Sequence, residues 1–168
     1  IPSVIFSPLG TSFTTNTEPL ADNHGCVIYS TNDFRQAEYG LKMLHAGARM
    51  KHTRCVVIQG NKRFEQQLAE TGISLQFVPA EVFMNEYNAM PVTREVEAMA
   101  DEYIKRAGSI RQATRQDVIN GIKSYRVAGS ILEKENADAI SMDCLGALGN
   151  TPISLPCIAW SRMNDDGI

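Results

Sequence analysis

One short segment constrains the fold of this chain most: residues 55–58 are four consecutive apolar residues, Cys-Val-Val-Ile. A strand with one face in water alternates polar and apolar residues, whereas a strand of a parallel sheet is covered on both faces and reads as a continuous apolar run. The run ends at 59–61, Gln-Gly-Asn, which is typical of a turn. We therefore expect a buried parallel strand at 55–58, with helices on both faces of its sheet.

Segments with strand and helix patterns alternate after this run. Beyond residue 60 we expect helices at 64–70, 80–90, 93–107 and 114–136, and strands at 73–78 and 137–142. Residues 153–160 fit either a strand or a helix. This alternation predicts an α/β fold, a doubly wound parallel sheet of the Rossmann-like type.

The residues before the run have a similar but less complete pattern. Strands are expected at 2–6 and 26–29, and the Thr-, Pro-, Asn- and Gly-rich segment 7–23 reads as a loop. A helix follows, with an apolar face at Phe34, Ala37, Leu41, Leu44 and Ala48. We expect two domains that meet near 51–54: 1–52, the C-terminal part of a first α/β domain, and 53–168, an incomplete second α/β domain.

Capping residues and glycines mark the expected helices. Thr114 and Asp117 have the spacing of a capping-box variant. Gly72 would end the first helix after the run in the left-handed conformation. Gly121 and Gly129 lie inside the longest helix at a cost of about 1 kcal/mol each. Their presence predicts close packing of that helix against a neighbouring segment.

Composition excludes several classes of protein. The chain has 168 residues, with 16 Lys and Arg against 19 Asp and Glu, so it lacks the basic field of a nucleic-acid-binding protein. No apolar run approaches the roughly 20 residues that span a bilayer, so we expect no membrane segment. Hydrophobic residues make up 43% of the chain, which is enough for a folded core.

The cysteines and histidines suggest no metal centre. The cysteines are Cys26, Cys55, Cys144 and Cys157, without a CxxC pair or zinc-ribbon spacing. Three of them lie in apolar runs, so we expect buried free thiols in a reducing, cytoplasmic compartment. The three histidines form no HxH or HExxH pair.

Ligands of open α/β sheets bind beyond the carboxyl ends of the strands, and three loops qualify. The loop at 59–62 has one glycine, but GxGxxG and phosphate-loop motifs are absent, so an ordinary tight turn is the alternative. The acids of 79–86 fit either a polyol or a solvated surface. The third region has the most functional groups, namely Asp143, Cys144, Cys157, Arg162, Asn164 and Asp166.

Two chemistries are disfavoured in this third region. No histidine lies near Cys144 or Cys157 in the sequence to activate a thiol nucleophile. Residues 164–167, Asn-Asp-Asp-Gly, lack the regular spacing and terminal glutamate of a calcium loop. A plain polar turn is the alternative for that segment.

The third region resembles the L-fucose isomerase-like proteins, relatives of L-fucose and L-arabinose isomerases. The segments that carry the resemblance are 136–148, NADAISMDCLGAL, and 153–168, ISLPCIAWSRMNDDGI. Residues 33–60 are similar to the join between the first two domains of that family. The resemblance implies two doubly wound domains, a β-rich domain and an oligomer that interconverts aldose and ketose sugars. It also implies Mn²⁺, which holds two sugar oxygens while carboxylates move a proton through an enediol.

The resemblance implies only part of a site here. Bordering the sugar would be Asp143, Cys144, Cys157, Arg162, Asn164 and Asp166, of which Asp143 and Arg162 are the best polar contacts. Pro156 and Cys157 stand where L-fucose isomerases have a metal-binding glutamate, and the other metal ligands of the family lie beyond Ile168. We therefore expect a fragment of an isomerase-like enzyme for a deoxy-hexose or pentose, with Mn²⁺ in the parent enzyme but no metal or catalytic residue assigned in this chain.

Two other functions stay open. The missing glutamate favours a non-catalytic sugar-binding or assembly module on the same scaffold. A nucleotide-binding domain is disfavoured because no phosphate loop is present. A removed domain would leave apolar surface bare, so we also expect exposed apolar side chains and a homo-oligomer.

Overall fold

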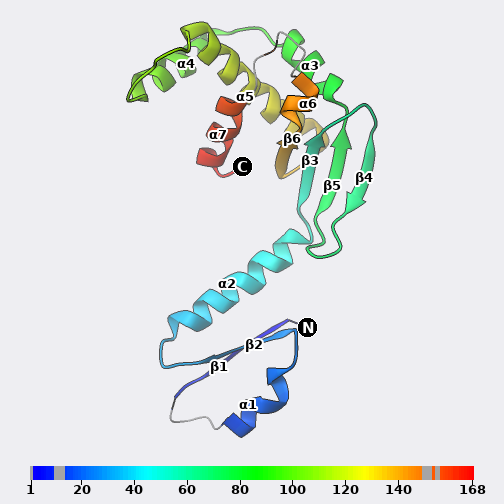
Figure 1. Cartoon of the computed structure of the whole chain (residues 1–168), viewed down its shortest axis with the longest axis vertical. Coiled ribbons are helices and arrows are strands. Elements are labelled where there is room, and N and C mark those ends of the chain that lie inside the picture. The colour runs from blue at the N-terminus through cyan, green and yellow to red at the C-terminus, as the bar shows by residue number, and fades with distance from the viewer. Residues whose placement is uncertain (1, 10–13, 149–152, 154–155) are drawn as a thin grey trace. The chain divides into compact units, whose positions relative to one another are not determined.

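The computed structural model describes residues 2–9, 14–148, 153 and 156–168 (Figure 1). The chain divides into two compact units, Ile1–His52 and Thr53–Ile168. Both units combine helices with parallel strands, so the chain is a mixed α/β protein with mostly parallel sheets. Within the described ranges, none of the helices has the length and apolar character needed to cross a membrane.

The first unit is a β-α-β-α segment. Strands β1 (Ser3–Ser7) and β2 (Cys26–Ser30) pair in parallel, α1 (Thr14–Ala21) connects them, and α2 (Arg35–Met50) follows. The loop predicted over 7–23 is therefore wrong for the residues of α1. Parallel neighbours need a crossover connection, and a helix provides it here despite the low helix propensity of Thr, Asn and Pro.

Helix α2 packs on its two strands through small residues. A Cβ at Gly40 would lie only 2.8 Å from Val4 Cγ1, and Ala37 is 7% exposed. The predicted apolar face is only partly buried, because Phe34 is 70% exposed and Leu41 is 60% exposed. Close approach of the helix to the strands selects Ala and Gly at the contact, while Phe34 and Met43 reach Phe6 and Tyr29 of the strands at either side of it.

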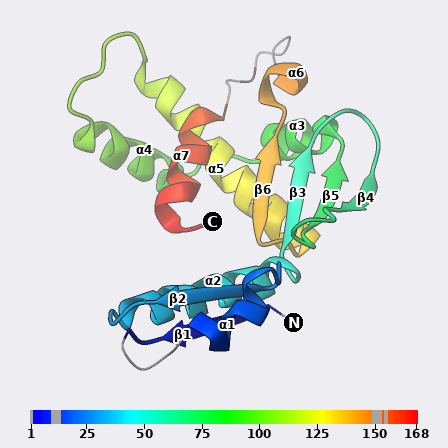
Figure 2. The ribbon, with the colours of Figure 1, turned by 60° about the horizontal axis from the view of Figure 1, so that its bottom comes forward.

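The second unit is built on a four-stranded sheet in the order β4-β5-β3-β6 (Figure 2). Strand β3 (Arg54–Ile58) lies between β5 (Ser74–Val78) and β6 (Ala139–Met142) and is parallel to both. Ile58, the last residue of β3, pairs with Val78 and Met142, so the carboxyl ends of these strands share one edge. The parallel strand predicted at 55–58 is confirmed, but Val56 and Ile58 are buried whereas Cys55 and Val57 are only half-buried, so the expected cover on both faces is not seen among the described residues.

Strand β4 (Phe64–Gln67) is an antiparallel edge strand, so the helix predicted at 64–70 is wrong. Gly72 has the expected left-handed backbone, with φ 78°, but it closes a hairpin turn instead of a helix, and its N–H donates to the Leu68 carbonyl at 2.7 Å. The Phe64 ring stacks on Phe77 with 4.1 Å between centroids. This cross-strand aromatic contact stabilises a strand where an isolated helix of two turns is marginal.

The remaining helices agree with the sequence pattern except α6, for which no helix is predicted. Helices α3 (Ala80–Ala89), α4 (Arg94–Arg106) and α5 (Arg115–Glu135) lie where helices are predicted, and α6 (Cys144–Leu148) and α7 (Cys157–Asp166) follow β6. Helix α7 settles the choice at 157–160 in favour of a helix. The capping box is confirmed, because Thr114 Oγ1 accepts from Asp117 N at 3.2 Å and Asp117 Oδ2 accepts from Thr114 N at 2.8 Å.

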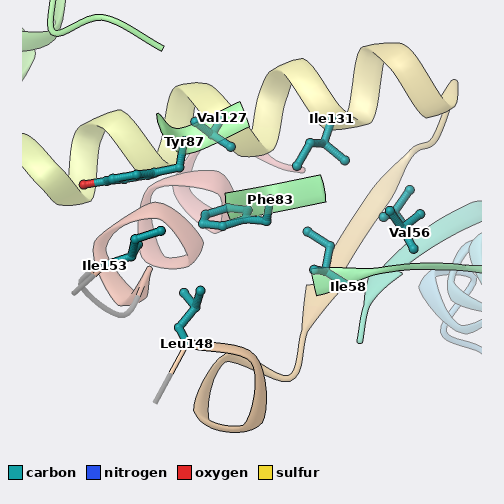
Figure 3. Close-up of a cluster of buried hydrophobic side chains, with 9 residues drawn as sticks. Val56, Ile58, Phe83, Tyr87, Val127, Ile131, Leu148 and Ile153 are labelled. Atoms are coloured by element: carbon teal, nitrogen blue, oxygen red, sulfur yellow. The ribbon is translucent and has the colours of Figure 1, made fainter. Parts of the chain in front are cut away.

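The core of the second unit lies on one face of its sheet, where strands β3 and β5 meet helices α3 and α5. Its buried side chains include Val56, Ile58, Val78, Phe83, Val127 and Ile131 (Figure 3). Cys55 and Val57 alternate with the buried residues of β3, so they belong to the opposite face. They are half-buried and are members of none of the clusters formed by the described residues.

Candidate functional site

A cavity of about 280 Å³ lies between the end of β6, the start of α6 and helix α7. Its polar lining comes from Ser141, Cys144, Trp160 and Asn164. Its apolar lining includes Ile140, Met142 and Met163. The cavity belongs to the second unit and lies by the carboxyl end of a parallel strand, which is where open α/β sheets bind ligands.

Helix α7 can form one wall because it packs closely on α5. A Cβ at Gly121 would lie 2.8 Å from the Cβ of Ile158, so only glycine allows this approach. Met163 of the same helix packs in a cluster with Leu132. The close packing predicted at Gly121 is confirmed, whereas Gly129 faces open space and that prediction is wrong.

A polar network fixes the other end of α7. The Tyr125 hydroxyl donates to Asp166 Oδ2 at 2.8 Å, and Arg162 Nε donates to the same oxygen at 3.1 Å. These hydrogen bonds hold the pKa of Asp166 below its ordinary value, with Tyr125 contributing most, and the same carboxylate raises the pKa of Tyr125. Asp166 therefore anchors α7 to α5 and positions the wall of the cavity.

Asp143 lies just before α6 and outside the lining of the cavity. Its Oδ1 accepts a hydrogen bond from Gly146 N at 3.1 Å, and its own N–H donates to the Ile58 carbonyl at 3.0 Å. A Cβ at Gly146 would lie 2.3 Å from Asp143 Oδ2, so the glycine makes room for this cap. The carboxylate thus contacts backbone, and it is exposed to solvent.

The structure brings only some of the six predicted residues together. Cys144 and Asn164 line the cavity. Cys157 is the first residue of α7 and is exposed, and the other three cysteines are half-buried, so the prediction of buried thiols is wrong, although all four cysteines are free. Arg162 lines a different cavity, between α4, α5 and α7.

Two lining residues, Ser141 and Trp160, are not predicted from the sequence. Ser141 lies in a short strand where nothing distinguishes it from other strand serines. Trp160 carries a usable signal, because it is the only tryptophan of the chain and an indole joins a large apolar face to a polar N–H. That combination suits a ligand with both apolar and hydroxyl surfaces.

The loops at 59–62 and 79–86, the other two candidate ligand sites, make hydrogen bonds and ion pairs within the protein. Gly60 adopts a left-handed φ of 61°, and its carbonyl accepts a hydrogen bond from Ala80 N at 3.0 Å. Glu86 forms an ion pair with Lys134. Neither loop contributes a residue to the lining of the β6–α7 cavity.

The cavity lining does not fit Mn²⁺. Manganese prefers carboxylate, carbonyl and water oxygens, whereas the side chains of the described lining supply one amide, one hydroxyl and one thiol and no carboxylate. In the part of the chain that the structure describes, no group of three or more His, Cys, Asp or Glu side chains is arranged to hold a metal ion.

Comparison with known proteins assigns no relative. No protein-family model matches the chain, and no curated protein matches it.

Proposed function

We propose that the chain is part of a sugar isomerase-like protein and that its second unit forms one wall of the carbohydrate site. The observation that supports this most is the β6–α7 cavity, where the only tryptophan lies beside an amide, a hydroxyl and a thiol. Its volume of about 280 Å³ lies just below the range of about 300–1,000 Å³ for ligand pockets, so it suits a ligand no larger than a monosaccharide.

The lining offers each contact that a deoxy-sugar needs. The indole of Trp160 presents an apolar surface to the C–H face of the ring. The Asn164 amide both donates and accepts hydrogen bonds, as does the Ser141 hydroxyl, so each can pair with a sugar hydroxyl. Met142 and Met163 supply flexible apolar contacts for a methyl group. These contacts favour a deoxy-hexose or a pentose over a charged ligand.

The proposed role of this chain is to bind and orient the sugar. The described residues do not fit the Mn²⁺ that the resemblance implies, so we assign no metal-dependent step and no proton transfer to them. Pro156 and Cys157, which replace the glutamate that the resemblance implies, are consistent with this restricted role.

A non-catalytic sugar-binding or assembly module is the second candidate. It is favoured by the same observation, that the described lining of the cavity has no carboxylate for acid–base chemistry. Turnover distinguishes the two candidates. Aldose–ketose conversion by the protein, lost on chelation, supports the isomerase, and saturable sugar binding without turnover supports the module.

We also propose the finer architecture, location and assembly that accompany this function. The parallel order β5-β3-β6 and the continuous apolar run at 55–58 in β3 support a doubly wound, Rossmann-like sheet. The free cysteines support a reducing, cytoplasmic compartment. Exposed apolar side chains in both units support a homo-oligomer.

Fluorescence of Trp160 provides the test. L-Fucose and L-arabinose should each change the emission of this single tryptophan saturably, and Asn164→Ala should weaken binding about ten-fold, the effect of one lost hydrogen bond to a ligand. The control is Asn88→Ala, which removes an exposed asparagine of α3 and should leave the affinity unchanged. Unchanged emission at every sugar concentration, or equal losses in the two variants, would contradict a carbohydrate site in this cavity.

A further inference from the structure

A second cavity, of about 310 Å³, lies between α4, α5 and α7. Its lining includes the charged residues Glu102, Arg106, Arg162 and Asp165, and the ring of Tyr103 beside Ile122. Trp160 and Asn164 do not line it, although both lie on α7. The cavity is therefore separate from the proposed sugar site, and helix α7 contributes to both.

Two guanidinium groups reach this cavity from different helices. Arg106 ends α4, and its Nη1 lies 4.0 Å from Glu102 Oε1, a loose contact between side chains that are about 70% exposed. Arg162 on α7 donates through Nε to Asp166 at 3.1 Å and also interacts with the Tyr125 side chain, but a guanidinium carries five N–H donors. Both arginines thus retain N–H donors, and paired guanidinium groups bind phosphate oxygens through several hydrogen bonds.

Two carboxylates, Glu102 and Asp165, line the same cavity and favour a ligand that has hydroxyl groups as well as an anionic group. Glu102 and Asp165 balance the two arginines, and Asp166 adds a further negative charge beside Arg162, so a bare anion gains little from these charges. Carboxylates accept hydrogen bonds from hydroxyl groups. Tyr103 and Ile122 add an apolar surface that suits the C–H face of a sugar ring.

We propose that the α4–α5–α7 cavity binds a sugar phosphate, with Arg106 and Arg162 on the phosphate and Glu102 and Asp165 on the hydroxyls. This site is additional to the β6–α7 cavity and does not depend on the function proposed for that cavity. Because α7 contributes to both cavities, a ligand held by Arg162 also contacts the helix that carries Trp160.

Calorimetric titration with three probes tests the proposal: D-glucose 6-phosphate, inorganic phosphate and D-glucose. The sugar phosphate should bind more tightly than either of the other two, since only it engages both pairs of side chains. Arg106→Ala should weaken its binding at least ten-fold. The control is Arg126→Ala. Arg126 belongs to α5, lies outside the cavity and is 3.6 Å from Glu95, so its loss should not change the affinity for the sugar phosphate.

Three results would contradict the proposed site. The first is no heat of binding with D-glucose 6-phosphate, and the second is equal affinity for inorganic phosphate and the sugar phosphate. The third is an equal loss of affinity in the Arg106 and Arg126 variants. A second readout separates the two cavities. Amide signals of Tyr103 and Ala107 should shift with D-glucose 6-phosphate in the protein and in Asn164→Ala alike, because Asn164 lines only the other cavity.

Discussion

Glu135 shows how a single carboxylate joins the end of a helix to an edge strand. It accepts two hydrogen bonds from Arg63, at 3.0 and 2.8 Å, and one from Gln76 Nε2 at 2.8 Å. Arg63 immediately precedes β4, Gln76 lies in β5 and Glu135 ends α5. The carboxylate is 13% exposed, so its hydrogen bonds are partly shielded from water. These contacts help to hold the β4–β5 hairpin against the helix layer.

Replacement of Glu135 by Gln should lower the free energy of unfolding by about 1–2 kcal/mol near neutral pH, because it removes charge-assisted hydrogen bonds. The Arg63 hydrogen bonds lower the pKa of Glu135 in the folded protein. A carboxylate with a lowered folded pKa contributes stability above its unfolded pKa, about 4.3, and loses it as the pH falls through the folded value. Urea unfolding from pH 7 to pH 3 should show the two proteins converging in acid.

The matched control for this prediction is Glu133→Gln, an exposed glutamate of the same helix turn, which should change stability little at any pH. A constant difference between wild type and E135Q across the whole pH range would show that packing, and not the ionised carboxylate, is responsible.

The hydroxyl of Tyr125 is expected to control the pKa of Asp166. Tyr125→Phe removes the hydroxyl that donates to Asp166 at 2.8 Å and contributes most to the lowered pKa of that carboxyl. The pKa of Asp166 should therefore rise toward its ordinary value, which ¹³C NMR of the carboxyl measures directly. Tyr103→Phe, whose hydroxyl is not part of this network, should leave the Asp166 pKa where it is. A pKa that does not respond to Y125F would assign the shift to Arg162 instead.

Among elements, the packing of α7 on α5 is the contact that shapes both cavities. Gly121→Ala would place a Cβ 2.8 Å from Ile158, which must shift, so we expect a loss of about 1–3 kcal/mol in unfolding free energy. Gly129→Ala, in the same helix, meets open space and should gain about 0.5–1 kcal/mol from helix propensity. Denaturant unfolding of the two variants measures the contrast. If both substitutions stabilise the protein, the close approach of α7 does not exist in solution.

The same elements show where sequence patterns suffice. The local signals for α5 agree with one another, since a capping box, a buried stripe and a left-handed Asn136 after its last residue all mark the same helix. The segment of β4 is different, because its left-handed Gly72 is compatible with either a helix end or a hairpin, and only pairing with β5 decides between them. Long helices are thus set by local sequence, and short edge strands by distant partners.

The candidate site was predictable only in part for a similar reason. Cys144 and Asn164 lie near a strand end in a segment rich in functional groups, and the cavity contains both. Asp143 and Arg162 lie in the same segment but turn to a helix cap and to another cavity. Their positions in the chain bring these residues to one region. The direction of each side chain depends on the helix that it caps or belongs to and on how that helix packs, which the spacing of functional groups does not reveal.

In the second unit, the face of the sheet opposite the core carries apolar side chains that are exposed or half-buried, and we expect it to mediate association of the whole molecule. Phe64 is 51% exposed and stacks on Phe77, and the strand period places Leu75, Cys55 and Val57 on the same face. Contiguous apolar surface of this kind marks interaction sites in folded proteins. The homo-oligomer that we propose would bury it, so sedimentation should show mass rising with protein concentration.

Phe64→Glu should shift that equilibrium toward the monomer, because association would then bury an unpaired carboxylate within the contact. Val92→Glu is the matched control, since Val92 is 45% exposed but lies between α3 and α4, away from the sheet face. Circular dichroism would establish that both variants stay folded. A protein that is monomeric at every concentration and binds no hydrophobic dye would show that this face is already covered, and the apolar contact would then have to be sought within the chain itself.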